Sequence, residues 1–125
     1  MTKKDTKKLS KRSLPREVKI SVEASLAKKA EDVVVLDLRE ISSFTDYFII
    51  THGNSPRQNR AVYESVEQEL KKEKVTFLSV EGREHAEWIL MDYGSFIVHI
   101  FSKASRDYYS LEKLWGDAPK LSYLI

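Results

Sequence analysis

The sequence predicts an α/β fold of the α+β kind, with a mixed five-stranded sheet flanked by helices. Two long segments carry apolar residues at helical spacing, and five short segments are rich in β-branched and aromatic residues. The two kinds of segment are interspersed along the chain, which is typical of a sheet with helices packed on it. The chain has 125 residues, which suits one domain, and 42% of them are hydrophobic, which is enough for a core.

Apolar residues at intervals of four predict the first helix. Val18, Val22 and Leu26 have this spacing, and residues 13–15, Ser-Leu-Pro, are typical of a helix start. We expect this helix to end at about residues 29–30.

Two strands and a second helix are expected next. Residues 33–38 form a β-branched apolar run of buried-strand character, and residues 47–51 form a second strand. The turn that follows contains Ser55, a favoured N-cap residue, and Pro56, which suits the first helical position because it has no amide proton to leave unpaired. The second helix is expected to run to about Lys74.

Three strands and a short helix complete the predicted fold. Residues 75–80 and 88–92 are expected to be strands, and the tight turn Tyr93-Gly94 leads into a fifth strand over 95–101. The last two strands should form an antiparallel hairpin. Ser110 is expected to cap a short final helix.

Charge is distributed unevenly along the chain. Residues 1–19 carry eight basic and two acidic side chains, a net charge of +6, whereas the other 106 residues carry 13 basic and 17 acidic side chains, a net charge of −4. We therefore expect residues 1–14 to be a basic, flexible tail and residues 15–125 to be a single, mildly acidic domain. The tail is interpreted either as a loose contact with a polyanion such as RNA or as a solvated leader.

Several classes of protein are excluded or disfavoured. The chain has no cysteine, which excludes disulfide scaffolds, zinc–cysteine sites and thiol catalysis. No apolar run approaches the roughly 18 residues that span a bilayer, and the first residues lack the apolar stretch of a secretory signal. A cytoplasmic protein without membrane contact is therefore expected.

Catalytic machinery is not indicated either. The four glycines are isolated, so no phosphate-binding loop is predicted, and no Asp-x-Asp pair for metal-dependent nucleotidyl transfer lies on a predicted strand. The three histidines are scattered. His99, which alternates with Val98 and Ile100, is more typical of a hydrogen-bonded structural residue. We expect neither an enzyme nor a bound metal or cofactor.

The strand over residues 88–92 is the clearest candidate for a binding surface. It is apolar on both faces, and strand alternation puts Trp88, Leu90 and Asp92 on the same one. A large exposed apolar patch usually marks an interface, where tryptophan is a favoured anchor. From spacing alone, a partner-binding role for Trp88 and a place in a core covered by helices on both faces are equally good interpretations.

Several motifs resemble those of one protein family. They occur in order over residues 15–118, at 30–37, 45–50, 53–58, 81–82, 88–94, 98–101 and 106–115. The most specific is Trp-Ile-Leu-Met-Asp-Tyr-Gly at 88–94. Together they are similar to the ribosomal silencing factor family, RsfS, also called Iojap-like. Because the motifs are independent and have natural spacing, chance is a poor explanation.

The resemblance implies both a fold and a function. The implied fold is related to that of nucleotidyltransferases but lacks their catalytic carboxylates. The implied function is binding to the large ribosomal subunit through ribosomal protein uL14, which sterically prevents the small subunit from joining and lowers translation when nutrients are short. A homodimer is a further implication, and the basic tail would then be able to touch ribosomal RNA weakly.

The candidate partner-binding residues lie on the fourth and fifth strands and at the head of the second: they are Trp88, Leu90, Asp92, His99, Asp46 and Tyr47. The first two are expected as apolar anchors, the next two as their polar neighbours, and the last two as adjoining residues. The family's usual pattern is broken at three positions, by His52, Glu87 and Ser95. Two alternatives stay open: a catalytically active nucleotidyltransferase relative, and an RNA-binding ribosome-assembly factor.

Overall fold

A mixed sheet of six strands forms the centre of the fold. The computed structural model describes residues 9–123. The strands are β1 (Glu31–Asp37), β2 (Tyr47–Gly53), β3 (Ser79–Glu81), β4 (Trp88–Asp92), β5 (Phe96–Ser102) and β6 (Lys120–Tyr123). Their order across the sheet is β3-β4-β5-β2-β1-β6. The β2–β5 pair is parallel and the other pairs are antiparallel, including the predicted β4–β5 hairpin.

The sixth strand corrects the predicted count of five. Strand β6 pairs with β1 in antiparallel register, from Val33 opposite Tyr123 to Leu36 opposite Lys120. The segment is only four residues long, so its alternation is too short to separate a strand from a loop. Its pairing with β1, some 85 residues earlier in the chain, makes it a strand.

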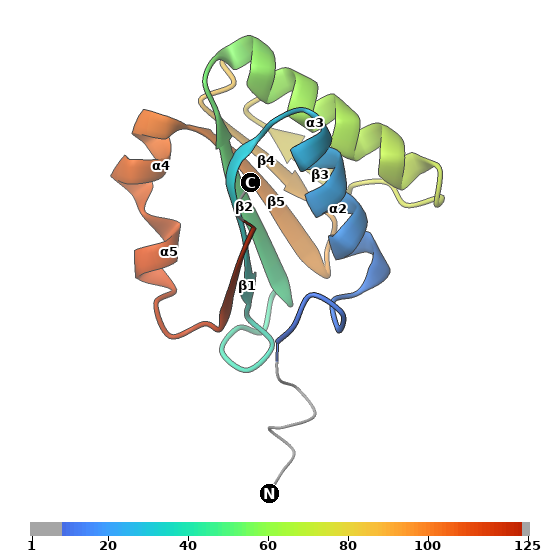
Figure 1. Cartoon of the computed structure of the whole chain (residues 1–125), viewed down its shortest axis with the longest axis vertical. Helices are drawn as coiled ribbons and strands as arrows, with labels where there is room; N and C mark the ends of the chain where they lie inside the picture. Colours follow the sequence, from blue (N-terminus) through green and yellow to red (C-terminus); the bar gives the residue numbers. More distant parts are fainter. Residues whose placement is uncertain (1–8, 124–125) are drawn as a thin grey trace, which may run out of the picture.

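Two helices cover one face of the sheet, where the main core lies. Helices α2 (Arg16–Ala27) and α3 (Pro56–Lys71) lie side by side there (Figure 1). The predicted apolar stripes are confirmed, because the side chains of Val18, Val22 and Val62 are fully buried. These side chains contact the apolar residues of the same sheet face.

Helix α3 begins as predicted and ends earlier. The Ser55 hydroxyl oxygen accepts a hydrogen bond from the Gln58 amide at 3.0 Å, which is the expected N-cap contact. At the other end, Lys74 has a left-handed backbone with φ +63°, and the Val75 amide donates to the Leu70 carbonyl. This capping turn ends the helix at Lys71 rather than at Lys74.

The opposite face of the sheet is covered only in part, by helices α4 (Lys103–Tyr109) and α5 (Leu111–Leu114) (Figure 1). The sequence analysis missed α4, which is capped by the Ser102 hydroxyl accepting from the Ser105 amide at 3.1 Å. Ser110 stands at the N-cap position of α5 as predicted, but its side chain makes no capping hydrogen bond. That residue has a left-handed backbone with φ +44° between the two helices, and its hydroxyl donates to the Asp107 carbonyl.

The third strand is shorter than predicted. Only residues 79–81 pair with β4, and residues 75–78 approach the core as an irregular segment. The half-buried side chains of Val75 and Phe77 still pack against the core, which explains the apolar pattern that predicted a longer strand.

The N-terminal segment packs on the domain sooner than the expected boundary at residue 15. Leu14 is buried in the core, and Leu9 packs against it. The Lys11 ammonium group lies 4.6 Å from the centroid of the Tyr123 ring. Residues 1–8 of the expected tail lie outside the described residues. Within residues 9–123, no helix is long and apolar enough to cross a membrane.

Candidate binding face

Strand β4 divides its side chains between the two faces of the sheet as predicted. Ile89 and Met91 are fully buried and contact the core under α2 and α3. Trp88, Leu90 and Asp92 alternate with them and are half-buried on the opposite face. We call this second face, as presented by β4 with the neighbouring helices α4 and α5, the β4 face.

The β3–β4 loop determines where strand β4 starts and that its first side chain, Trp88, points to the β4 face. Gly82 has φ +85°, and a Cβ atom on it would lie 1.9 Å from the Trp88 carbonyl oxygen, so only glycine fits here. The buried Asn59 side chain of α3 donates to the Ala86 carbonyl at 2.8 Å. The loop is thereby tied to α3, and the chain enters β4 with Trp88 turned to the β4 face.

Trp88 lies within a chain of aromatic contacts. Its ring centroid is 4.9 Å from that of Phe101, its direct cross-strand neighbour, and 4.6 Å from that of Tyr109 on α4. The chain of contacts continues through His99 to Phe48, whose ring centroids are 4.4 Å apart. Trp88 is therefore partly packed against neighbouring rings and partly exposed, and its role in binding a partner stays a prediction.

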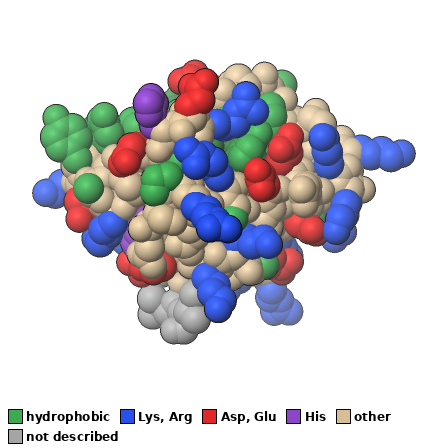
Figure 2. Space-filling view, turned by 90° about the horizontal axis from the view of Figure 1, so that it is seen from above, with side chains coloured by type: hydrophobic (Ala, Val, Ile, Leu, Met, Phe, Trp, Pro, Cys, Tyr) green, Lys and Arg blue, Asp and Glu red, His purple; other side chains and the backbone are tan. Residues whose placement is uncertain are grey.

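Exposed hydrophobic side chains surround this aromatic chain. Tyr108 on α4 is 81% exposed, Leu114 on α5 is 73% exposed, and Phe44 in the β1–β2 loop is 59% exposed. Phe44 contacts the half-buried Trp115, with ring centroids 6.1 Å apart. In Figure 2, hydrophobic side chains protrude at the left end of the molecule, the side on which α4 lies in Figure 1.

The sequence analysis missed the contribution of α4 and α5 to this face. Tyr109 contacts Trp88 with its ring tilted, and Trp115 contacts Phe48 edge to face at 5.9 Å. Both residues lie in the segment that carries the family resemblance, so that segment was the available signal. Their position over the sheet depends on how α4 and α5 fold back, which spacing along the chain does not show.

His99 lies beneath the β4 face rather than on its surface. Its side chain is 3% exposed, and its Nδ1 atom accepts a hydrogen bond from the Trp88 indole N–H at 3.1 Å. Burial lowers the pKa of His99 to about 3, so the ring is neutral at physiological pH. His99 therefore contacts Trp88 from within the fold and is not itself part of the exposed surface.

Asp92 has a structural contact in addition to its position on the face. Its Oδ1 atom accepts from the Gly94 amide at 2.8 Å, which stabilises the β4–β5 turn. Glu81 of β3 lies directly opposite Leu90 in the register and is exposed. Because paired residues in a sheet point to the same side, Glu81 and Asp92 place carboxylates beside the apolar residues of the β4 face.

Asp46 and Tyr47 lie apart from this cluster. Tyr47 is 5% exposed and contacts the core on the α2 and α3 side, so the structure does not bring it to the β4 face. Burial raises the pKa of Tyr47, and the Arg39 guanidinium lies 5.4 Å from its ring centroid. Asp46 is exposed, and its amide donates to the Ser95 carbonyl, which places it next to the β4–β5 turn.

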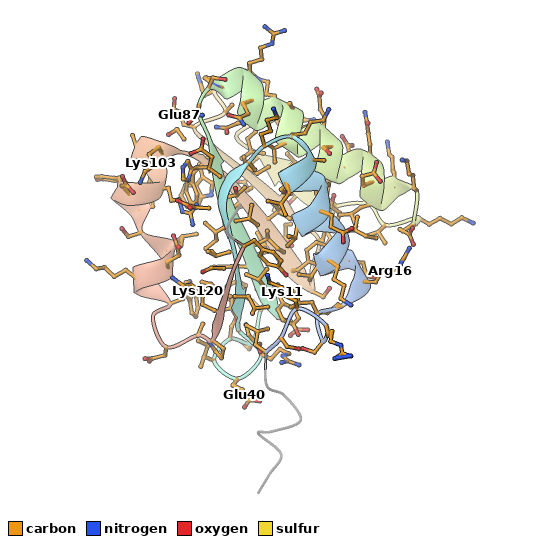
Figure 3. All side chains as sticks on the ribbon, in the orientation of Figure 1. Lys11, Arg16, Glu40, Glu87, Lys103 and Lys120 are labelled. Carbon is orange, nitrogen blue, oxygen red and sulfur yellow. The ribbon has the colours of Figure 1, made fainter. Side chains whose placement is uncertain are left out.

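Of the three departures from the family pattern, His52 has a side-chain contact, whereas the contacts described here for Ser95 and Glu87 are made by their backbone carbonyls. His52 is buried, and its Nδ1 atom accepts from the Arg106 guanidinium at 2.9 Å. The Ser95 carbonyl accepts from Asp46, as described above. The Glu87 carbonyl accepts from the Ser102 amide at 2.9 Å, and Figure 3 shows Glu87 and Lys103 at the same end of the sheet. All three positions therefore join neighbouring elements of the fold.

Arg106 joins the last helices to the sheet. Its guanidinium makes two hydrogen bonds of 3.0 Å to the Glu112 carboxylate, and its Nη1 atom contacts His52. Since arginine only donates, the His52 Nδ1 must be unprotonated, and burial together with the Arg106 charge lowers the pKa of His52. This polar cluster holds α4 and α5 against β2.

At the turn before α3, the backbone amides of Asn54 and Gln58 already have partners, so they are not available to bind a phosphate. The Gln58 side-chain oxygen accepts from the Asn54 amide at 2.7 Å, and the Ser55 hydroxyl accepts from the Gln58 amide. The chain's own side chains thus take these donors at the helix start. Within residues 9–123, no group of three or more histidine, aspartate or glutamate side chains is placed to hold a metal ion.

Comparison with known proteins gives a consistent result. A family model described as "Ribosomal silencing factor during starvation", RsfS, matches residues 11–123. Ribosomal silencing factor RsfS of Bacillus subtilis is 43% identical over 102 residues, which cover 82% of this chain and 86% of that protein. A mouse protein named "Mitochondrial assembly of ribosomal large subunit protein 1" is 32% identical over 89 residues, covering 69% of this chain and 39% of the mouse protein.

A solved structure agrees with the fold. The crystal structure of a Chromobacterium violaceum protein superposes with a TM-score of 0.78 at 38% identity, covering 80% of this chain and 83% of the other. The likeness therefore covers most of both chains and is accompanied by sequence identity, rather than being a shared fold class alone.

Proposed function

The chain belongs to the RsfS family of ribosomal silencing factors, and from this premise we propose that it binds the large ribosomal subunit through ribosomal protein uL14 and sterically blocks association with the small subunit. Translation would fall as a result when nutrients are limited. The contact acts in the cytoplasm and involves no bond chemistry, since bulk at the intersubunit face is sufficient.

The β4 face carries this proposal. It combines half-buried Trp88 and Leu90 with the exposed Tyr109, an arrangement of aromatic and apolar anchors that is typical of binding hot spots. Glu81 and Asp92 at its margin favour a partner surface with an apolar centre and basic neighbours. A standard interface buries roughly 1,600 Å² in total, and α4 and α5 extend the β4 face toward the required area.

A role in assembly of the large subunit is a second candidate. The name of the mouse relative states assembly of the ribosomal large subunit, and the same β4 face would serve an assembly intermediate. Silencing and assembly both require contact with the large subunit. They differ in the stage at which the protein binds. A weak contact of the basic N-terminal residues with ribosomal RNA, and a homodimer in the unbound state, are compatible with either role.

The test is sedimentation of the full chain with purified large subunits, small subunits and their mixture. We expect comigration with large subunits alone and a reduced amount of the joined particle in the mixture. Absence of the protein from every ribosomal fraction would contradict the proposal. Binding to large subunits without any effect on joining would favour the assembly role.

A charge reversal on the β4 face sharpens this test. Glu81→Lys should weaken comigration, because it places a positive charge where a basic partner surface is expected. Glu64→Lys is the matched control, since Glu64 is an exposed glutamate of α3 on the other side of the sheet. Equal binding by both variants would show that the partner does not meet the Glu81 side of the β4 face.

The enzymatic alternative has its own readout. If the chain were an active nucleotidyltransferase relative, ATP with magnesium would bind the native state and raise its melting temperature. We expect no shift. A rise of several degrees at millimolar nucleotide would favour the alternative.

A further inference from the structure

The environment of His99 is apolar apart from one hydrogen bond: Ile50 and Leu90 lie opposite it on the two neighbouring strands, and aromatic rings surround it. Its ring lies against Phe48 at a centroid distance of 4.4 Å and is stacked parallel to Phe101 at 6.1 Å. Its one polar contact within residues 9–123 is the 3.1 Å hydrogen bond to the Trp88 indole. The His99 Nε2 atom is buried and has no hydrogen-bond partner in this part of the chain.

This hydrogen bond determines the state of the histidine ring. The Trp88 indole nitrogen only donates, so the His99 Nδ1 atom must be the unprotonated acceptor. In a neutral ring the proton then lies on Nε2, the atom without a partner. Burial favours the neutral ring as well, because it disfavours the charged form.

A residue chosen only to fill this space would not be a histidine. An unpaired buried donor destabilises the fold, and a phenylalanine or leucine would fill a space lined by aromatic and aliphatic side chains without that penalty. The acceptor on Nδ1 is the feature that an apolar side chain could not provide. Its only use in the described structure is to fix the indole of Trp88.

We propose that His99 is a positioning residue, which holds the Trp88 indole in one orientation on the β4 face so that a partner meets a preformed surface. The inference rests on the proposed function, because it gives Trp88 a partner. Trp88 is connected to the core by this hydrogen bond and by a tilted ring contact with Phe101, and it also contacts Tyr109 of α4. Restricting its rotamers before binding lowers the entropy that binding must remove.

The indole N–H of Trp88 is not available to a partner. The indole N–H of Trp88 is already committed to His99, so the partner would contact the ring and its edge rather than accept a hydrogen bond from Trp88. Trp88→Phe therefore removes the connection to His99 while it keeps an aromatic anchor. Loss of binding in this variant would come from positioning more than from lost contact.

The experiment is a double-mutant cycle on the full chain, with binding to purified large subunits measured for each variant. His99→Leu and Trp88→Phe should each weaken binding by about fivefold to tenfold, the size expected for one hydrogen bond. Combined, they should weaken it by little more than either alone, because each removes the same contact. His99→Asn should bind more tightly than His99→Leu, since its amide oxygen can take the place of Nδ1.

A spectrum of the free protein tests the positioning separately from binding. The chain has two tryptophans, so two indole ¹⁵N–¹H signals are expected, and the one missing in Trp88→Phe belongs to Trp88. This signal should shift in His99→Leu and return toward its original place in His99→Asn. Urea unfolding of each variant verifies that the folded fraction is unchanged.

The outcomes separate this inference from the proposed function. An unchanged Trp88 indole signal in His99→Leu, or fully additive losses of binding in the double mutant, would overturn the positioning role. A wild-type chain that does not bind large subunits would instead overturn the proposed function, whatever the spectrum shows. Binding by wild type together with a non-additive cycle supports both.

Discussion

At the scale of single residues, the side chains on the two faces of β4 have different roles. Ile89 is fully buried under α2 and α3, whereas Trp88 is half-buried and contacts the rings of Phe101 and Tyr109. One strand thus contributes to the core through one set of side chains and to a surface through the other. Substitutions at neighbouring positions should therefore separate folding from binding.

Trp88→Ala should weaken binding to the large subunit by at least about 2 kcal/mol, or about thirtyfold, as expected for an aromatic hot spot. Ile89→Ala should instead lower the free energy of unfolding by about 2–5 kcal/mol, because it leaves a cavity in the core. Affinity per folded molecule and urea unfolding are measured on both variants. If Ile89→Ala abolished binding in a stable fold while Trp88→Ala bound normally, the partner would lie on the other face.

The pH dependence of stability follows from the two buried histidines. The pKa of His99 is lowered to about 3 by burial, so between this pH and about 6.5 the unfolded chain takes up a proton that the folded chain does not. The free energy of unfolding should therefore decrease as the pH falls below about 6.5, by up to about 1.4 kcal/mol per pH unit for this group. His52, whose pKa burial and Arg106 also lower, acts in the same direction.

His99→Asn removes one of these titrating groups. Its unfolding free energy should depend less steeply on pH between about 6.5 and 4 than that of the wild type, as measured by urea unfolding at a series of pH values. Identical slopes for the two proteins would show that the folded and unfolded chains protonate His99 alike.

At the scale of elements, the connection of α4 and α5 to the sheet decides how the β4 face is built. Both helices are short, and α5 has four residues, so neither is stable on its own. Arg106, which is buried, reaches across from α4 to Glu112 and to His52. The two helices keep Tyr109 and Trp115 over the sheet only while this connection is intact.

Arg106→Leu should lower the free energy of unfolding by about 2–3 kcal/mol, because it removes charge-assisted hydrogen bonds to Glu112 and leaves His52 without its partner. Lys103→Ala is the matched control on the same helix. Its ion pair with Asp107 is exposed and should contribute little, within about 0.5 kcal/mol. Chemical denaturation measures both, and an equal effect of the two substitutions would contradict the role given to Arg106.

At the scale of the whole molecule, the basic N-terminal segment and the acidic domain differ in charge, and we expect them to differ in role. The described part of that segment packs on the domain through Leu9 and the buried Leu14. Residues 1–8 carry four of the eight basic side chains found within residues 1–19. We expect their charge to give a sequence-independent contact with ribosomal RNA, in addition to the binding proposed for the β4 face.

Truncation at two positions tests this division. Deleting residues 1–8 should leave the unfolding free energy unchanged and cause a modest loss of affinity for the large subunit that disappears at high salt. Deleting residues 1–14 should in addition destabilise the fold by about 2 kcal/mol or more, since Leu14 leaves the core. If removal of residues 1–8 alone destabilised the protein, the packed segment would begin earlier than Leu9.

The sequence by itself determined the elements whose signals are local. The N-cap at Ser55 with Pro56, the alternation of β4 and the tight β4–β5 turn depend on residues next to one another, and each was predicted where it is found. The family was also recognisable, because its motifs are short and keep their order along the chain.

Only the tertiary structure decided which distant segments meet. Strand β6 exists because it pairs with β1, Tyr47 turns to the core side, and His99 lies beneath Trp88 rather than beside it. Alternation tells which residues share a face, but not which face a helix far along the chain will cover. Helices α4 and α5 cover the β4 face only in part because both are short. Arg106 holds them against β2 through a long-range contact that no local pattern encodes.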